Sequence, residues 1–173
     1  MNLSDIYLYR MTHIENVPHI LKQGITHKNS PNANPNYVAI GDENLIDTRA
    51  TRQVNISNGN RSQSFGKVAL GDFIPFYFGV RMPMLYVMQY GCNGVKKILP
   101  EDIVYLVCKL SDICQTEIKY FFSNKHAVDA FALFYDFSKI ADLPTIINWE
   151  AVIFTSPVLR RRTWRHVVLR LLW

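Results

Sequence analysis

The segment IYLYRMTHIENVPHILKQG (residues 6–24) encodes a short strand followed at once by a capped helix. Apolar and polar residues alternate from Ile6 to Arg10, as in a half-buried strand. Asn16 is a preferred N-cap residue, and Pro18 suits the first turn of a helix. Gly24 stands where a C′ glycine ends many helices. The N-terminal part of the chain therefore predicts a strand and then a helix.

The rest of the chain mixes helical and strand patterns without a regular alternation of the two. Residues 26–36 are turn formers and are expected to form a loop. Helices are predicted at 44–51, from Pro83 to a stop at Gly91, near 111–119 and at 125–137. Strands are predicted at 73–78, where Pro75 indicates a sheet edge or a strand start, and at 103–108 and 120–122. Because no βαβ pattern, repeat or linker is visible, we predict a single α+β domain.

The composition is that of a globular protein. The chain has 173 residues, of which 49% are hydrophobic and 13% aromatic, enough for one domain with a substantial core. Its longest apolar stretches fall below the roughly 18 residues of a membrane span, and no signal pattern opens the sequence. Three cysteines without CxxC spacing argue against a disulfide framework and a zinc site. We therefore expect a soluble cytoplasmic protein without a membrane partner.

The formal net charge of +5 is concentrated at one end of the chain. Glu150 is the last acidic residue, and five arginines follow it, at positions 160, 161, 162, 165 and 170. The first 150 residues are therefore neutral overall, so the basic balance is weak evidence for a nucleic-acid partner. Any DNA contact before residue 150 depends on where individual basic residues lie, among them Arg49, Arg52, Lys67 and Arg81.

Several enzyme signatures are absent from the sequence. There is no G-x-S-x-G motif, no Walker A motif and no G-x-G-x-x-G motif after a strand. The five histidines do not pair with a cysteine or a carboxylate at the spacing that a metal site on one helix needs. We therefore expect no metal cofactor.

A few polar residues stand out among apolar neighbours, and each also has a plain structural interpretation. Thr12 and His13 follow a strand, where they can face a ligand, but Thr12 equally suits a helix cap. Arg49 and Arg52 can meet a phosphate or form a solvated helix face. Arg81 lies among aromatic and methionine residues, which suit a base or phosphate site but more often form core. Taken singly, these residues support only a soluble α+β domain.

Seven short segments, taken in order, carry more information than any single residue. They are YRMTHIENVPHILKQGI (9–25), YVAIG (37–41), IDTR (46–49), DFIPFYF (72–78), RMPMLY (81–86), NKHA (124–127) and INWEA (147–151). Together they resemble the DarT family, the DNA ADP-ribosyltransferase toxins of bacterial toxin–antitoxin pairs. The resemblance covers residues 6–152.

The resemblance implies a compact ADP-ribosyltransferase domain, with a split mixed β-sheet and flanking helices. It also implies an activity: the use of NAD to transfer ADP-ribose to a base, often thymidine, of single-stranded DNA. Such a transfer needs a base nitrogen to lose its proton, so a positioned proton acceptor contributes about 10²–10⁴-fold. We accordingly expect a monomer whose protein partner is a macrodomain-type antitoxin.

The resemblance further implies roles for individual residues. Arg49 would bind NAD and help to remove the proton from the base. The NAD site would also include Arg10, Met11, Thr12, His13, His19 and His27, with the 26–36 loop as a lid. The DNA path would include Arg52, Tyr77, Arg81, Met82, Tyr86 and His126. The expected site is thus assembled from segments far apart in the sequence.

The sequence departs from the family pattern after residue 152. The family's catalytic glutamate lies in a later segment, whereas no carboxylate side chain follows Glu150 here. We therefore predict a DarT-like domain at 1–152 and a divergent basic tail at 153–173. One interpretation of the tail is a basic helix that binds DNA, because four apolar residues have helical spacing: Val167, Val168, Leu171 and Leu172.

Two other interpretations of the tail compete with the helix. It can be an out-of-frame or truncated end, or Glu150 can substitute for the missing acid from a different element. We favour the out-of-frame end, by comparison with the family pattern; the abrupt change in composition after residue 152 is of the same kind. The transferase activity is then expected to be impaired. The alternative function is a catalytically silent module that binds NAD or single-stranded nucleic acid.

Overall fold

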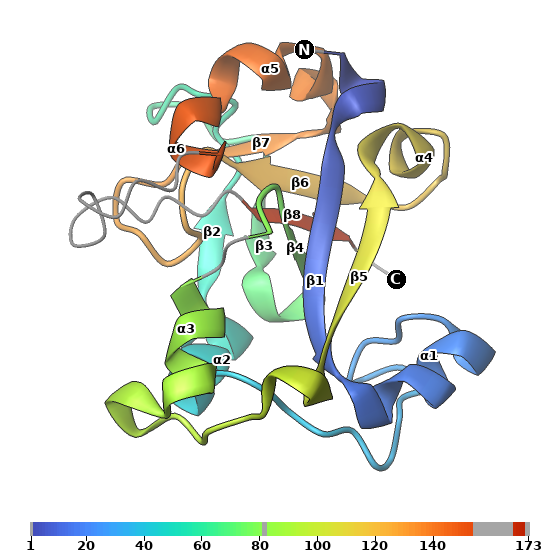
Figure 1. The fold of residues 1–173 in the computed structure, drawn as a ribbon. Coiled ribbons are helices and arrows are strands. Elements are labelled where there is room, and N and C mark those ends of the chain that lie inside the picture. Colours follow the sequence, from blue (N-terminus) through green and yellow to red (C-terminus); the bar gives the residue numbers. More distant parts are fainter. Residues whose placement is uncertain (1, 81–82, 154–167, 172–173) are drawn as a thin grey trace.

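Six strands form one sheet with short helices at both of its ends (Figure 1). The computed structural model describes residues 2–80, 83–153 and 168–171. The strands of the sheet are β1 (Tyr7–His13), β4 (Ile74–Tyr77), β5 (Ile103–Lys109), β6 (Tyr120–Ser123), β7 (Phe134–Asp136) and β8 (Val168–Leu171). Their order is β5-β1-β4-β8-β6-β7, and a separate hairpin pairs β2 (Gln53–Asn55) with β3 (Lys67–Ala69).

The helices gather in two groups. α4 (Leu110–Cys114), α5 (Leu143–Ile146) and α6 (Trp149–Ile153) lie at the top of the view in Figure 1. At the bottom lie α1 (Val17–Gln23), α2 (Glu43–Thr51) and α3 (Pro83–Tyr90). Short 3-10 helices are η1 (Leu3–Asp5), η2 (Ile14–Asn16), η3 (Leu70–Asp72), η4 (Cys92–Gly94), η5 (Pro100–Asp102) and η6 (Phe137–Asp142). This mixture of helices and strands confirms the predicted α+β class.

The sheet opens between β1 and β4. β1 pairs with β5 along its whole length, from Tyr7↔Lys109 to His13↔Ile103, whereas its ladder with β4 consists of the pair Tyr9↔Tyr77. Pro75, the second residue of β4, has no N–H to give to a neighbouring strand. We expected a mixed sheet, but all strand pairs within the described sheet are antiparallel. A parallel pairing occurs outside the named strands, in the isolated bridge between Ile56 and Phe134.

β8 occupies the centre of the sheet. It pairs with β4 from Ile74↔Leu171 to Tyr77↔Val168, and with β6 from Tyr120↔Leu171 to Phe122↔Leu169. The helical interpretation of the tail is therefore wrong for residues 168–171, while positions 167 and 172 lie outside the described residues. The backbone of β8 joins two sub-sheets, β5-β1-β4 and β6-β7.

The helix predicted at 125–137 is also wrong, because turns and the strand β7 replace it. Asn124 closes a loop: its N–H donates to the carbonyl of Leu133 (3.2 Å), and its Oδ1 accepts from the N–H of Leu133 (2.9 Å). Inside this loop the Asp129 side chain accepts from the N–H of Phe131 at 2.7 Å. Side chains of Asn and Asp compete in this way with helical hydrogen bonds. The helix predicted near 111–119 is shorter than expected and ends at Cys114.

Alternating side chains of the sheet enter two different cores. In β6, Phe121 packs with the cluster that includes Val54 of the hairpin, and its neighbour Phe122 packs with the cluster that includes Leu143 of α5. β7 repeats the alternation, with Phe134 in the first cluster and Tyr135 in the second. Successive side chains of a strand point to opposite faces of the sheet, so each of the two clusters covers one face. A third cluster surrounds Met88 of α3.

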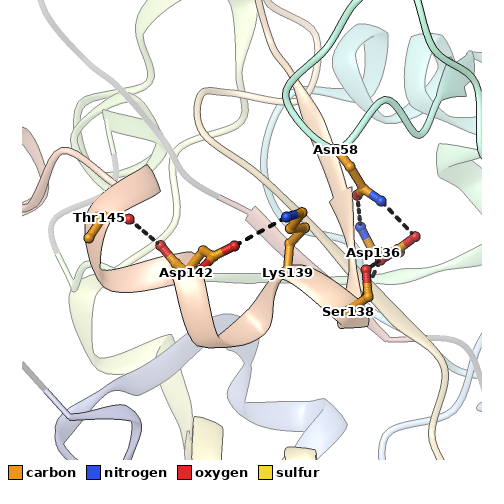
Figure 2. A network of polar contacts seen from close by, with 6 residues as sticks. All are labelled: Asn58, Asp136, Ser138, Lys139, Asp142 and Thr145. Atoms are coloured by element: carbon orange, nitrogen blue, oxygen red, sulfur yellow. Dashed lines mark hydrogen bonds and ion pairs between the residues drawn. The ribbon is translucent and has the colours of Figure 1, made fainter.

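A polar network fastens the β2–β3 hairpin to β7 (Figure 2). Asn58 Nδ2 donates to Asp136 Oδ2 at 3.0 Å, and the backbone N–H of Asp136 donates to Asn58 Oδ1 at 3.0 Å. Burial alone would raise the pKa of Asp136, but hydrogen bonds from Ser138 and Asn58 and the charge of Lys139 outweigh it and lower the pKa. Lys139 also pairs with Asp142 at 3.3 Å. The network fixes the hairpin beside the loop that carries His126.

Candidate active site

A cleft of about 580 Å³ is lined by β1, β4, α2, α3 and the loop between α1 and α2. Its polar lining residues are Arg10, Thr26, His27, Lys28, Asn34, Tyr37, Asp42, Arg49, Tyr77 and His126. Its apolar walls include Met11, Ile40, Leu45, Ile46, Phe73, Ile74, Met84 and Met88. Of the residues predicted from the sequence, the structure brings six into this cleft: Arg10, Met11, His27, Arg49, Tyr77 and His126.

The opening between β1 and β4 places Arg10 in the cleft. Its Nη1 donates to the carbonyl oxygen of Pro75 at 3.1 Å, across the gap that the strand ladder leaves. The guanidinium has five N–H donors, so this bond leaves others for a ligand. The missing strand pairing thus creates a half-buried cationic position in the wall of the cleft.

The loop between α1 and α2 is held by one buried side chain, Asn16. Its Nδ2 donates to Thr12 Oγ1 (3.1 Å) and to the carbonyl of Val38 (2.8 Å), and its Oδ1 accepts from the N–H of Val38 (2.9 Å). Asn34 Nδ2 also approaches Oδ1, at 3.4 Å. From the sequence, Asn16 is predicted only as a helix cap. The sequence signal that could have indicated its role in holding the loop is an asparagine followed by a loop rich in turn formers.

Arg49 lies in the last turn of α2, and its side chain contacts two other lining residues of the cleft. Its Nη2 lies 2.7 Å from Nε2 of His126, and its Nη1 donates to the hydroxyl of Tyr77 at 3.4 Å. Arginine can only donate, so Nε2 of His126 is the acceptor in this contact. The Nε of Arg49 is buried and makes no hydrogen bond with any described residue. The site therefore holds a permanent cation in contact with a ring nitrogen of His126.

α2 can approach the site because a glycine lies beneath it. A Cβ added at Gly71 would lie 2.8 Å from the Cα of Ala50, the residue after Arg49. Backbone atoms of a helix cannot move aside at low cost, so only glycine fits here. The carbonyl of Gly71 also contacts Nε2 of His27. Gly71 thus allows α2 to pack closely against η3, and its carbonyl holds His27 at the cleft.

Several other predicted residues lie outside the lining of the cleft. Thr12 is buried against Asn16, and His13 accepts from the N–H of Glu15 at 3.3 Å. His19 contacts the carbonyl of Asn32 in the loop at 2.9 Å. These three positions make contacts within β1, the start of η2 and the loop, and do not line the cleft.

The predicted DNA residues are dispersed. Arg52 donates to the carbonyl of Val128 at 2.9 Å and so supports the loop that carries His126. Tyr86 is 57% exposed on α3, and its ring lies 4.5 Å from that of Tyr90. Positions 81 and 82 lie outside the described residues, so the structure does not place Arg81 or Met82. Glu150 is exposed on α6, which lies in the upper helix group, apart from α2 (Figure 1).

The charges of the cleft suit an anion. Arg10, Lys28 and Arg49 supply three cations, and Asp42 supplies the one carboxylate among the described lining residues. Asp42 also caps α2, because its Oδ1 accepts from the N–H of Leu45 at 3.2 Å. Cations beside apolar walls can hold a phosphate together with a ring system.

The described part of the chain offers neither a metal cluster nor a membrane-spanning helix. No group of three or more His, Cys, Asp or Glu side chains there could hold a metal ion. Nor does any described helix have the length and the apolar character needed to cross a membrane.

A family model described as "ssDNA thymidine ADP-ribosyltransferase, DarT" matches residues 9–167. The chain is 29% identical over 166 residues to a DNA ADP-ribosyl transferase of Escherichia coli O127:H6, which covers 96% of this chain and 68% of that protein. It is 28% identical over 142 residues to a DNA ADP-ribosyl transferase–DNA ADP-ribosyl glycohydrolase fusion protein of Thermosipho africanus, covering 82% of this chain and 32% of that protein.

Solved structures of a Thermus relative have the same fold. Thermus sp. 2.9 DarT in complex with ADP-ribosylated ssDNA superposes with a TM-score of 0.70 at 25% identity. The same protein in complex with NAD+ superposes with a TM-score of 0.65 at 26% identity. In both cases the match covers 96% of this chain and 75% of the Thermus chain. The family model spans most of the chain, and the cleft contains the predicted arginine and histidine; this protein belongs to the DarT family.

Proposed function

We propose that this chain binds NAD in the cleft and transfers ADP-ribose to a base, thymidine by preference, of single-stranded DNA. The observation that carries the proposal is the contact of 2.7 Å between Arg49 and His126 in the wall of a cationic cleft. Relatives with this fold have been solved with NAD+ and with ADP-ribosylated single-stranded DNA, which supports the same ligands here. The role of such a protein is that of a toxin paired with an antitoxin.

The lining of the cleft suits NAD. Its volume of about 580 Å³ lies within the range of roughly 300–1,000 Å³ typical of small-molecule sites. Arg10, Lys28 and Arg49 are the residues that would hold the pyrophosphate, while Met11 and His27 lie where a ring or ribose can pack. The buried Nε–H of Arg49, which has no described partner, is a donor that a bound anion would satisfy. Thr12, His13 and His19 would act indirectly, by supporting β1 and the loop.

Arg49 and His126 would act together on the base. NAD supplies the ADP-ribosyl group, with nicotinamide as its leaving group. When Arg49 turns toward an anion, the lone pair on Nε2 of His126 can accept the proton that the base nitrogen loses. Tyr77, whose hydroxyl accepts from Arg49, would border the base. Arg52, Arg81, Met82 and Tyr86 remain our predictions for the DNA path.

The second candidate function is binding of NAD or single-stranded nucleic acid with slow or no transfer of ADP-ribose. Asp42 carries the one carboxylate among the described lining residues and is engaged as a helix cap, and Glu150 is exposed on α6. Such a site would bind NAD or single-stranded nucleic acid without efficient chemistry. We therefore propose a transferase of low activity, with a silent binding module as the alternative.

Calorimetry and mass spectrometry separate these two functions. The protein is incubated with NAD and a thymidine-containing single-stranded oligonucleotide, and the gain of one ADP-ribose per strand is followed. We expect NAD binding that Arg49→Lys weakens at least tenfold, because lysine cannot contact His126, Tyr77 and an anion together. Binding without any gain in mass would favour the silent module. Absence of NAD binding by the unmodified protein would refute the transferase, and absence of both NAD binding and oligonucleotide binding would refute the silent module as well.

The acidic residues provide a second set of variants. If Asp42 assists the transfer, Asp42→Asn lowers the rate more than it lowers the NAD affinity. If Glu150 substitutes for the missing acid, Glu150→Gln does the same. Lys22→Gln, a charge change at an exposed position on α1, is the control and should leave both quantities unchanged.

The partner is proposed on the same basis. The Thermosipho africanus relative is fused to a DNA ADP-ribosyl glycohydrolase, which supports a macrodomain-type antitoxin for this chain. Addition of such a glycohydrolase to the labelled oligonucleotide should remove the added mass. We also propose a cytoplasmic monomer, and a dimer in analytical ultracentrifugation would overturn that part.

A further inference from the structure

An exposed aromatic ring with two cations beside it lies outside the cleft. Phe131, in the loop between β6 and β7, is 65% exposed. The guanidinium carbon of Arg61 lies 5.6 Å from the centre of its ring, and the Nζ of Lys125 lies 5.4 Å from it. We call these three residues the Phe131 patch. Arg61 belongs to the β2–β3 hairpin, so two separate elements build the patch.

The patch carries positive charge. The ion pair recorded within the described part of the chain joins Lys139 to Asp142, so Arg61 and Lys125 are not neutralised by a described carboxylate. The nearest acid in sequence is Asp129, whose Oδ1 is engaged with the N–H of Phe131. An exposed aromatic ring with cations over it is a combination that binds a nucleic-acid strand, by base stacking where a base displaces a cation from the ring and by phosphate contacts of the cations.

The loop that presents Phe131 also presents His126 to the cleft. Phe131 is five positions after His126, so their Cα atoms are at most about 18 Å apart even in a fully extended chain. The loop is not extended: Asp129 N–H donates to the carbonyl of His126 (2.8 Å), and Ala132 N–H to that of Asp129 (3.2 Å). Arg52 fastens the loop to the end of α2 through Val128. The patch is therefore held at a fixed place next to the cleft.

We propose that the Phe131 patch binds the part of a single DNA strand that flanks the target base, with one base stacked on Phe131 and phosphates at Arg61 and Lys125. This inference rests on the proposed function, because the strand reaches the patch from a base held near His126. The patch would lengthen the footprint on DNA without contacting NAD.

The test measures oligonucleotide and NAD binding separately. Labelled oligothymidylates of increasing length are titrated by fluorescence anisotropy, and NAD by calorimetry. Phe131→Ala should weaken binding of the longer strands about fivefold or more, the loss typical of one stacked base, and leave NAD binding unchanged. Phe137→Ala is the matched control, because Phe137 is a phenylalanine with the same 65% exposure and should have no effect.

Two further measurements keep the proposal open to refutation. Arg61→Gln and Lys125→Gln should each reduce the slope of log affinity against log salt by about 0.7, as expected for one phosphate on a single strand. Phe131→Leu keeps an apolar side chain and should weaken strand binding as Phe131→Ala does. Equal strand binding by Phe131→Ala and Phe137→Ala overturns the proposal. If the unmodified protein binds strands through Phe131 but does not bind NAD, the proposed function fails and the patch stands.

Discussion

Replacing Asn16 by alanine should loosen the loop between α1 and α2 and destabilise the whole domain. The change removes three good hydrogen bonds, to Thr12 and to both backbone groups of Val38, and a longer one from Asn34. Each such bond contributes about 0.5–1.5 kcal/mol net, and Thr12 is left buried without this partner, so we expect a loss of about 3 kcal/mol. For a domain of this size that is a fall of about 6–12 °C in melting temperature.

Thermal unfolding followed by circular dichroism measures this change. Asn36→Ala is the control, because Asn36 is exposed in the same loop, and its melting temperature should stay within about 2 °C of the unmodified protein. Asn16→Ala should also weaken NAD binding at a temperature where it is fully folded, since the loop lines the cleft. A melting temperature within about 2 °C of that control refutes the idea that Asn16 holds the loop.

Two other predictions concern the packing of α2 and the acid end of the stability curve. Gly71→Ala brings a methyl group to 2.8 Å from the Cα of Ala50 and should cost about 2 kcal/mol; an unchanged melting temperature would show that α2 is not tightly seated. The lowered pKa of Asp136 stabilises the fold above about pH 4, the ordinary aspartate value, and this contribution is lost as the pH falls through the folded pKa. Ser138→Ala removes the hydrogen bond from the Ser138 hydroxyl to Asp136 Oδ1, which lowers the pKa of Asp136, so the melting temperature of the variant should fall less steeply with acidification below pH 4. Parallel curves for the variant and the unmodified protein would contradict this.

Local signals were sufficient for the first part of the fold. The strand and helix at 6–24 could be read from the sequence because alternation, a proline in the first turn and Gly24 all lie within the elements that they define. The helix at 125–137 was mispredicted because its apolar spacing is equally compatible with a loop. Asn124 and Asp129 divert the backbone there, and their partners are visible only in three dimensions.

The candidate site was predictable in part, and mostly through the resemblance. Arg49 and His126 are 77 residues apart, so no local pattern could show that their side chains meet. Asn16 was not predicted as part of the site, because it looked like an ordinary helix cap, and Asp42 was not singled out from the sequence at all. The hydrogen bonds of Asn16 to Val38 depend on how the loop folds back onto β1, which a linear motif does not encode.

The central position of β8 has a consequence for how the chain folds as it is synthesised. β4 and β6 emerge from the ribosome well before residues 168–171, yet β8 is the strand that lies between them. Until then the sheet exists as two pieces with unpaired inner edges, and such edges can pair with other chains. Pairing over so long a sequence separation is slow. The nascent protein would therefore remain without a complete sheet until its synthesis has passed residue 171, which delays any activity that depends on β4.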